Sequence, residues 1–486
     1  MMPIPISPER IEDAYRVAPE IILCASGIFI MLLDPFLPAA RKRICGWVAV
    51  IGAIGALASL WLVWQHRGPA YGGLIRADEF SIFIHGIVLT VAILAALGSM
   101  QYLDNERIQR GEYYSLLLFA AAGMGILGSA GELVTAFLGL EMSSISTYIL
   151  AGFRRTSLKS NEASLKYFIL GSFATAFFLY GIAMVYGATG TTTLARIQES
   201  LANSGPNLLE GLGIAMMFVG LGFKVVAAPF QVYAPDVYEG APTPVTAVLA
   251  SAPKAATFAL MLRIFYTAFG SAGQLWFWVI WIAAVLSMCI GNFAALNQTN
   301  IKRMLAYSSI AHAGYILVAF AAASEIGAAA VLFYLAAYAL MKLGAFLVVA
   351  QLGGPGERRL EIKDYAGLGT QQPVLAACFS LFLLSLLGLP ATGGFLGKFY
   401  AFQAALDSRL VWLVVIAAIN SVIGSYYYLR VIVSMYFWDP QKEFQPVAVT
   451  PGIGTALAIA AAGTIYLGIF PSRAMQFALL SALSLR

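Results

Sequence analysis

The sequence is poor in charge: Asp, Glu, Lys and Arg make up 11% of its 486 residues, whereas 60% are hydrophobic. Soluble domains have about a quarter of their residues charged, so this scarcity argues against an ordinary soluble protein. The mean hydropathy is +0.81, and apolar runs of about 20 residues, enough to cross a hydrocarbon core, recur along the chain. The net charge of +5 is not gathered into a basic stripe, so nucleic acid is not an expected partner.

Cysteine and nucleotide-binding motifs are also scarce. The four cysteines are Cys24, Cys45, Cys289 and Cys378. No two form a Cys-x-x-Cys pair and all lie in or beside apolar runs, so we interpret them as small core residues rather than ligands of zinc or an iron–sulfur cluster. The sequence has neither a Gly-x-Gly-x-x-Gly motif after a strand pattern nor a Walker loop. Any redox chemistry or nucleotide hydrolysis must therefore belong to a partner.

What the chain has is apolar segments from end to end, which predict an all-α polytopic membrane protein with about fourteen transmembrane helices. The first segment has a mixed-charge start and no small-residue cleavage site, so we expect a retained span and not a signal peptide. The predicted spans are 18–38, 44–65, 79–101, 112–129, 131–153, 162–187, 208–230, 240–266, 274–296, 301–322, 326–351, 373–405, 409–438 and 451–471.

Three of these spans, the seventh, eighth and twelfth, carry helix-breaking residues. The seventh runs into Pro229 and Pro235, and the twelfth contains Gly388-Leu-Pro-Ala-Thr-Gly-Gly-Phe-Leu-Gly-Lys398. Backbone groups freed at membrane depth must face protein or water, because lipid cannot satisfy them. Broken helices in matching positions of two halves are typical of a transport site.

The two breaks divide the chain into units. Each lies in the fourth helix of a five-helix block, and an odd number of spans makes consecutive blocks enter the membrane from opposite sides. We therefore predict two inverted five-helix repeats. The units are an N-terminal three-helix segment at 1–111, the repeats at 112–266 and 274–438, and a C-terminal helix at 439–486.

Orientation follows from the Lys and Arg residues of the loops, which are more numerous on the cytoplasmic side. One side has Arg41, Lys42, Arg43, Arg107, Arg110, Arg154, Arg155, Lys159, Lys302, Arg303, Arg358, Arg359, Lys363 and Lys442. The other has Arg10, Arg16, Arg67, Arg76, Arg196, Arg263, Arg409, Arg473 and Arg486. The larger set predicts the cytoplasmic face, which places both termini on the opposite side.

Six ionisable residues lie in the middle of predicted spans, and they are the candidate functional residues. They are Glu141, Lys224, Lys254, His312, Lys342 and Lys398. A charged side chain at the bilayer centre costs at least about 2.5–3.5 kcal/mol, a large burden for a purely structural bundle. Burial disfavours the charged forms of lysine and carboxylate alike, and histidine titrates near neutrality, so such a row is suited to proton transfer.

Each of these residues also has a structural interpretation. His312 could be a satisfied core histidine, and a buried lysine could be a fixed partner of Glu141. Lys166 and Arg430 lie near predicted helix ends, where snorkelling to the interface explains them. The nearby hydroxyls could hold water between the charges or serve only in helix packing; they are Ser143, Ser144, Ser146, Thr147, Ser308 and Ser309.

Several segments resemble subunit N of NADH-quinone oxidoreductase, one of three antiporter-like membrane subunits of respiratory complex I. They are 229–254 with its Gln231-Val-Tyr-Ala-Pro-Asp236, Gly222-Phe-Lys-Val-Val-Ala-Ala-Pro229, Gly139-Leu-Glu-Met-Ser-Ser144, Tyr307-Ser-Ser-Ile-Ala-His-Ala-Gly314 and the run that ends at Lys398. The sister subunit M is expected to have Glu at the position of Lys398, and subunit L a long lateral helix. Both departures favour subunit N.

The resemblance implies a role for each residue. Glu141 would pair with Lys224 on the broken seventh helix, Lys254 would be the central lysine, and Lys398 the exit-side lysine. His312 and Lys342 would lie on the polar axis between the two halves. It also implies a proton-translocating subunit of the bacterial inner membrane that is driven by electron transfer from NADH to quinone. FMN, iron–sulfur clusters and quinone are expected in partner subunits, with no cofactor or metal in this chain.

Two other functions remain open at this level. The chain could be a sodium/proton antiporter subunit that acts as a secondary transporter, or a scaffold that fills the membrane arm. Partners expected under the leading interpretation are the other membrane-arm subunits, including the sister antiporter-like subunits, together with the lipid bilayer.

Overall fold

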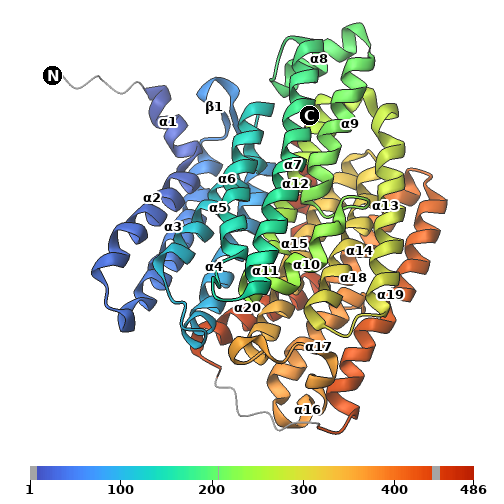
Figure 1. Cartoon of the computed structure of the whole chain (residues 1–486). Coiled ribbons are helices and arrows are strands. Elements are labelled where there is room, and N and C mark those ends of the chain that lie inside the picture. The colour runs from blue at the N-terminus through green and yellow to red at the C-terminus, as the bar shows by residue number, and fades with distance from the viewer. Residues whose placement is uncertain (1–7, 206, 441–448, 486) are drawn as a thin grey trace, which may run out of the picture.

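The computed structural model describes residues 8–205, 207–440 and 449–485, and helices dominate them (Figure 1). Lys442 and Arg486, which we used for orientation, lie outside the described residues. Eleven helical stretches of this part of the chain are long and apolar enough to cross a membrane. They comprise α2 (Ala18–Leu33), α3 (Arg43–Gln65), α4 (Glu79–Asn105), α6 (Leu133–Ala151), α7 (Leu158–Thr189), α11 (Thr243–Leu249) with α12 (Ala252–Leu262), α13 (Gly273–Leu296), α14 (Ile301–Ala321), α15 (Glu325–Leu352), α19 (Val411–Phe437) and α20 (Pro451–Ile469).

Further helices complete the bundle, and some of them occupy the remaining predicted spans. Helices α5, α9 and the pair α17 and α18 lie where we predicted spans at 112–129, 208–230 and 373–405. The count of fourteen membrane-crossing helices stays a prediction. These further helices are α1 (Pro8–Arg16), α5 (Gly111–Ser129), α8 (Leu194–Ser204), α9 (Leu208–Lys224), α10 (Ala234–Gly240), α16 (Leu368–Gln371), α17 (Pro373–Leu387), α18 (Gly393–Asp407) and α21 (Pro471–Leu483).

The remaining elements are short connections. Strands β1 (Gly68–Ala70) and β2 (Ile75–Ala77) pair antiparallel, with Pro69 opposite Arg76. Single turns link the helices, and a π-helical turn, η5 (Arg263–Ala268), extends α12. The 3₁₀ turns are η1 (Asp34–Phe36), η2 (Ala39–Arg41), η3 (Tyr71–Gly73), η4 (Gln231–Tyr233), η6 (Gly270–Ala272), η7 (Pro355–Glu357) and η8 (Ile362–Tyr365).

Polar side chains set where several helices begin. Asp78 caps α4: its carboxylate accepts from the Ser81 amide at 2.8 Å, while the Ser81 hydroxyl accepts from the Asp78 amide. Asn207 and Glu210 form the same reciprocal capping box at the start of α9. Such caps satisfy amide groups that have no partner within the helix, which matters most where water is scarce.

The helices differ in how far they are buried, and this separates a core from an apolar outer shell. Helices α4, α12, α14 and α15 are buried on nearly all sides, whereas α2, α7, α19 and α20 expose apolar faces. Leu32, Phe173, Trp412 and Val422 are examples of large side chains on those outer faces. A continuous apolar surface of this kind fits lipid as its solvent.

The predicted interruptions of the seventh, eighth and twelfth spans are confirmed. Helix α9 ends at Lys224, and Val226 follows with a φ of 63° before the chain resumes as η4 and α10. Helix α17 ends at Leu387, and the chain turns through Gly388, with a φ of 98° that favours glycine, before α18 begins. In the eighth span, α11 and α12 are separated at Ser251.

Two residues that we assigned to loops are buried, which corrects the sequence interpretation. Lys302 lies in the first turn of α14 and Arg263 at the end of α12, and both side chains are almost fully shielded. Each lies in a helical element and not in a loop, and neighbouring segments fold over it.

Candidate functional site

The ammonium of Lys224 lies at the first helix break, where α9 ends. Its Nζ donates to the Ser144 hydroxyl at 2.6 Å and to the Tyr148 hydroxyl at 2.8 Å, both on α6. The Tyr148 ring also faces the ammonium, with Nζ 4.8 Å from the ring centroid. The charge is therefore held by neutral oxygens and an aromatic face.

Glu141 lies on the same helix α6, one turn before Ser144. The direct Glu141–Lys224 pair that the resemblance implied is not among the ion pairs of the described residues, because Lys224 donates to Ser144 and Tyr148 instead. The Glu141 Oε1 atom is buried and has no hydrogen-bond partner within this part of the chain. A buried carboxylate oxygen without a donor is costly, which is a common mark of a functional group.

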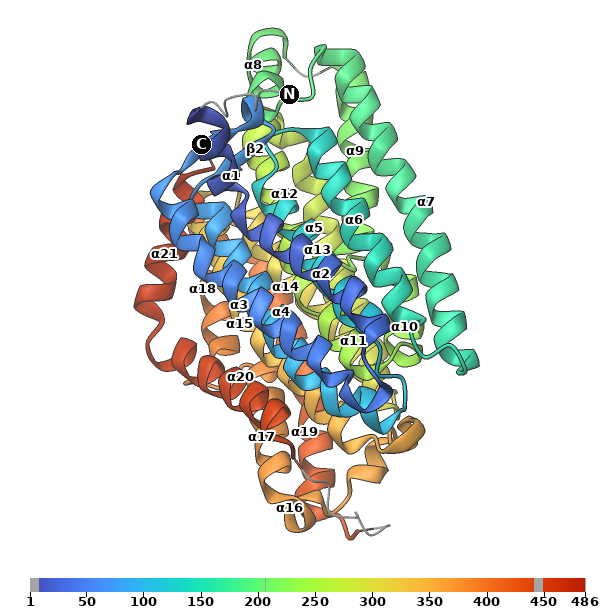
Figure 2. The same ribbon diagram turned by 90° about the vertical axis from the view of Figure 1, so that its left-hand side faces the viewer.

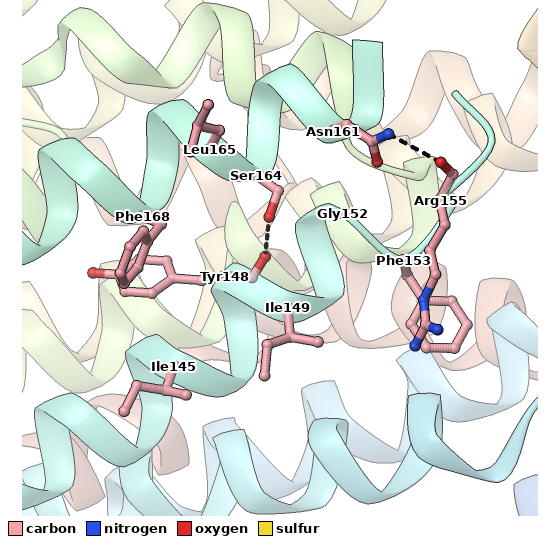
Figure 3. A pocket seen from close by; sticks show the side chains of 10 residues that line it. All are labelled: Ile145, Tyr148, Ile149, Gly152, Phe153, Arg155, Asn161, Ser164, Leu165 and Phe168. Atoms are coloured by element: carbon pink, nitrogen blue, oxygen red, sulfur yellow. Dashed lines mark hydrogen bonds between the residues drawn. The ribbon is translucent and has the colours of Figure 1, made fainter. Parts of the chain in front are cut away.

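A groove of about 490 Å³ between α6 and α7 opens beside this cluster (Figure 3). Its walls include Ile145, Tyr148, Leu165 and Phe168, and the side chain of Arg155 lies at one end. Tyr148 thus lines the groove with its ring while its hydroxyl accepts from Lys224. Tyr148 is therefore a residue shared by the groove and the Lys224 site.

Lys254 lies in the first turn of α12, just after the break at Ser251. Its Nζ donates to the Ser309 carbonyl of α14 at 2.6 Å and faces the Tyr338 ring at 5.6 Å. The Ser309 hydroxyl is hydrogen-bonded to the Tyr338 hydroxyl at 2.7 Å. Among the described residues no carboxylate lies within ion-pair distance of this ammonium.

A chain of hydrogen bonds joins Lys342 to His312. The Lys342 Nζ donates to the Ser308 hydroxyl at 2.9 Å, and the Ser308 hydroxyl contacts the Tyr428 hydroxyl at 2.5 Å. The Tyr428 hydroxyl lies 3.1 Å from His312 Nε2, and His312 Nδ1 lies 2.9 Å from the Tyr334 hydroxyl. Because a hydroxyl both donates and accepts, the links among Ser308, Tyr428, His312 and Tyr334 can reverse direction, whereas the Lys342 ammonium only donates.

Lys398 belongs to the second break. From α18 it reaches back to the end of α17, where its Nζ donates to the Leu387 carbonyl at 2.8 Å and to the Ser421 hydroxyl at 3.0 Å. A cation at the C-terminus of a helix satisfies carbonyl groups that lack amide partners. The Tyr315 ring lies 4.8 Å from the same ammonium and 5.7 Å from the His312 ring, so it contacts both groups.

The structure therefore brings some predicted residues together and keeps others apart. His312 and Lys342 share one hydrogen-bonded chain, and Lys254 lies beside it through Ser309 and Tyr338. The Lys224 cluster and Lys398 are separate sites. Of the candidate hydroxyls, Ser144 and Ser308 bind lysines, whereas Ser146 and Thr147 donate to carbonyls of their own helix.

Sequence reasoning missed the tyrosines that complete these clusters. Tyr428 bridges Ser308 and His312, and Tyr334, Tyr338 and Tyr148 contact the other charges. For Tyr428 the signal was the run Tyr426-Tyr-Tyr428 within a predicted span, where a phenol hydroxyl needs a buried partner.

The structure also shows a buried ion pair at the start of α14, between Lys302 and Glu357 of η7. The two side chains are 3.0 Å apart, and the Lys302 Nζ also donates to the Ala241 carbonyl at 2.6 Å. The other Glu357 oxygen accepts from the Thr243 amide at 2.8 Å and from the Tyr102 hydroxyl at 2.8 Å. This pair fixes the connection between α10 and α11.

The Glu357 carboxyl is held in its charged form. Burial raises its pKa, but the charge of Lys302 and the hydrogen bonds that the carboxylate accepts outweigh burial, so the pKa lies below its usual range. A second pair, Arg263 with Asp78 at 2.6 Å, joins η5 to the start of α4. Lys166 contacts Glu162 and Asp236 at the exposed surface, and Arg430 donates to the Leu296 carbonyl.

Comparison with known proteins gives a consistent result. The family model described as "NADH:quinone oxidoreductase/Mrp antiporter, TM" matches residues 130–424. The chain is 50% identical to NADH-quinone oxidoreductase subunit N 1 of Solibacter usitatus, over 99% of this chain and 100% of that protein. It is 48% identical to NADH-quinone oxidoreductase subunit N 2 of Koribacter versatilis, over 97% of each.

Solved structures agree with the sequence comparisons. A chain of respiratory complex I from Thermus thermophilus with bound aureothin is similar with a TM-score of 0.78 at 35% identity, covering 94% of this chain and 98% of that one. A chain of the Mrp complex from a Dietzia species gives a TM-score of 0.85 at 19% identity, covering 98% of this chain and 97% of that one, a likeness of fold alone. The chain therefore belongs to the subunit N family of NADH-quinone oxidoreductases.

Proposed function

We propose that this chain translocates protons across the membrane as the antiporter-like subunit N of a NADH-quinone oxidoreductase. The observation that carries the proposal is the set of buried lysines whose hydrogen bonds go to neutral oxygens and not to carboxylates. An ammonium held this way can lose its proton without leaving an unpaired carboxylate behind. The hydroxyls of Ser308 and Tyr428 supply a route for a proton between Lys342 and His312.

The residues divide into two halves under this proposal. Glu141, Lys224 and Lys254 serve the half at 112–266, and Lys398 serves the half at 274–438, with His312 and Lys342 between them. The two broken helices support an inverted repeat, because α9 and α17 both end beside a lysine. Tyr148, Tyr428 and Tyr315 would carry or gate the proton between neighbouring sites.

The driving energy comes from partners. Electron transfer from NADH to quinone takes place in other subunits, which hold FMN and the iron–sulfur clusters, and the chain assembles with the sister antiporter-like subunits. The similar Thermus chain is part of a respiratory complex I, which supports this arrangement. Among the described residues, no group of three or more His, Cys, Asp or Glu is placed to hold a metal ion.

The proposal is tested by replacing Lys224 or Glu141 with Ala in the assembled complex. Removing a positioned proton-transfer group lowers a proton-transfer rate by about 10²–10⁴-fold, so quinone-linked pumping in vesicles should fall strongly while the complex still assembles. Lys159→Ala is the matched control, since the Lys159 side chain is 77% exposed. Full pumping by both variants would refute the role of these residues, and sodium-driven proton exchange by the isolated chain would indicate an antiporter instead.

The location proposed is the inner membrane of a bacterium, with both termini on the non-cytoplasmic side. Cysteines placed in the loops near Arg41 and Arg358 should react with a membrane-impermeant reagent only from the cytoplasmic side. Labelling from the outside would invert this topology.

A further inference from the structure

A buried carboxyl–imidazole pair lies in the N-terminal three-helix segment, away from the lysines described above. Glu20 is in the first turn of α2, and His85 is in the second turn of α4; both are more than nine-tenths buried. The Glu20 Oε1 and His85 Nε2 atoms are 2.7 Å apart. The chemistry proposed for the lysine row makes no use of this pair.

The Ser81 carbonyl fixes the protonation of one nitrogen of the His85 imidazole. His85 Nδ1 lies 2.6 Å from the Ser81 carbonyl, and a carbonyl only accepts, so Nδ1 carries a proton and donates it. A neutral His85 therefore has a bare Nε2, which is an acceptor. An ionised Glu20 is also only an acceptor.

A distance of 2.7 Å between Oε1 and Nε2 thus requires one more proton between them. The pair is either a carboxylic acid that donates to neutral imidazole or a carboxylate that accepts from imidazolium. In both forms the pair as a whole is neutral and holds one proton beyond the Nδ1 proton. When that proton leaves to water, the pair carries one negative charge and two lone pairs face each other, so the contact cannot persist at this length.

Two further observations show a built but incompletely satisfied site. The second oxygen of Glu20, Oε2, is buried and has no hydrogen-bond partner among the described residues, which makes a permanent carboxylate costly. Helix α5 leaves room for the pair with Gly125: a Cβ there would lie 2.7 Å from His85 Nε2 and 3.0 Å from Glu20 Oε1.

Few other ionisable groups face the pair. Cys24 lies one turn further along α2, and Asp78, bound by Arg263, lies at the start of α4. Helix α5 contributes Gly125 and Ser129, whose hydroxyl donates to the Gly125 carbonyl.

The other helices packed on α2 and α4 hold their charges elsewhere. The ionisable side chains of α3 contact Asp34 and Asp104 at its opposite end. On α15, Lys342 is bound to Leu305 and Ser308, and Arg473 of α21 is exposed. No fixed cation of the described residues therefore lies within ion-pair distance of Glu20 and compensates its charge.

We propose that Glu20 and His85 form an additional proton-binding site, with one exchangeable proton between Oε1 and Nε2. Release of that proton loosens the contact between α2 and the helices behind it. Helix α2 lies on the outside of the bundle, in the half of the molecule where α1 and the β1–β2 hairpin lie (Figure 2). It can therefore move when the proton is released. The site lies towards the non-cytoplasmic face in our orientation, where a transported proton would leave.

The test uses infrared difference spectra of the whole purified complex as the pH is changed. We expect carboxyl and imidazole signals that titrate together in the wild-type complex. In Glu20→Gln the carboxyl signal should be lost and the His85 signal should titrate at a different pH. In His85→Gln the imidazole signal should be lost and the Glu20 carboxyl should titrate at a different pH, because the two groups share one proton in the wild type. Glu9→Gln is the matched control: Glu9 is an exposed carboxyl of α1, and its loss should leave the paired signals unchanged.

The variants differ in what they preserve. Gln at position 85 keeps a permanent amide donor towards Glu20, so this variant should fold while it abolishes the shared titration. A Glu20 carboxyl signal that titrates unchanged in His85→Gln would overturn the proposal. The proposal would also fail if the spectra of both variants kept every pH-dependent signal of the wild type. Lys224→Ala should keep the paired signals even where pumping is lost, which separates this site from the lysine row.

Discussion

Lys302 and Lys254 are both buried, with 0% and 1% of their surface exposed, and both begin a helix of the core. Their partners differ. Lys302 is paired with a carboxylate that accepts three further hydrogen bonds, two from Thr243 and one from Tyr102. Lys254, in contrast, donates to a carbonyl and faces an aromatic ring. Burial alone therefore does not identify a proton carrier. A lysine is suited to lose its proton when it has no carboxylate partner, because deprotonation then leaves no buried carboxylate unpaired.

The sharpest test of this comparison is Lys302→Met. Breaking a buried ion pair by removing one partner costs about 3–5 kcal/mol, because Glu357 is left buried and unpaired. We expect a lower yield of assembled complex and a clearly lower melting temperature, measured by intrinsic fluorescence. The double variant Lys302→Met with Glu357→Gln should recover part of the loss, and an undiminished melting temperature in the single variant would show that the pair is not structural.

Acidification tests the same pair without mutation. The pKa of Glu357 is lower in the folded protein than its ordinary value of about 4.3, so its stabilising contribution is complete above that value and is lost as pH falls through the folded pKa. The melting temperature of the wild type should therefore fall in this acid range more than that of Glu357→Gln. Parallel curves for the two proteins would contradict the assignment.

Lys254→Met should give the opposite result to Lys302→Met. The variant loses one hydrogen bond to the Ser309 carbonyl, about 0.5–1.5 kcal/mol, and removes an unpaired buried charge, so stability should change little. Proton pumping should be lost, and electron transfer in the partner subunits is measured in a separate assay. A strongly destabilised Lys254→Met would remove the distinction between the two lysines.

Tyr428→Phe makes the smallest change, a single oxygen. The variant keeps the ring but removes the only hydroxyl that contacts both Ser308 and His312 among the described residues. We expect a stability change within about 1 kcal/mol and slower pumping, with Tyr307→Phe as a control on a partly buried tyrosine of α14. Unchanged pumping would exclude Tyr428 from the route between Lys342 and His312.

The sequence predicted the features that depend on local chemistry. Glycine and proline located the helix breaks near Lys224 and Lys398, and the depth of Lys254 and Lys342 followed from span boundaries. Lys302 and Arg263 were placed in loops because nothing near them in the chain shows that η7 and the start of α4 cover them.

The hydrogen-bond partners of the buried lysines could not be predicted from the sequence. Ser144 and Tyr148 lie one and two turns beyond Glu141 on the same helix, and which of the three faces Lys224 depends on how α9 packs on its neighbours. The role of Tyr428 depends likewise on the approach of α19 to α14. Such choices are made by tertiary packing, which residue type and spacing do not encode.

The apolar outer faces of α2, α7 and α19 have a consequence for assembly. In lipid, acyl chains solvate Leu and Phe as well as another helix does, so neighbouring subunits gain no hydrophobic driving force by covering these faces. Recognition must then come from close shape fit and from the few polar groups on the outer surface of the bundle. Glu141 is one such group: it is half-buried and shares its helix with Leu138 and Ile145, whose side chains face outward. A few polar residues thus select the neighbouring subunit, since the rest of the surface packs equally well against lipid and against protein.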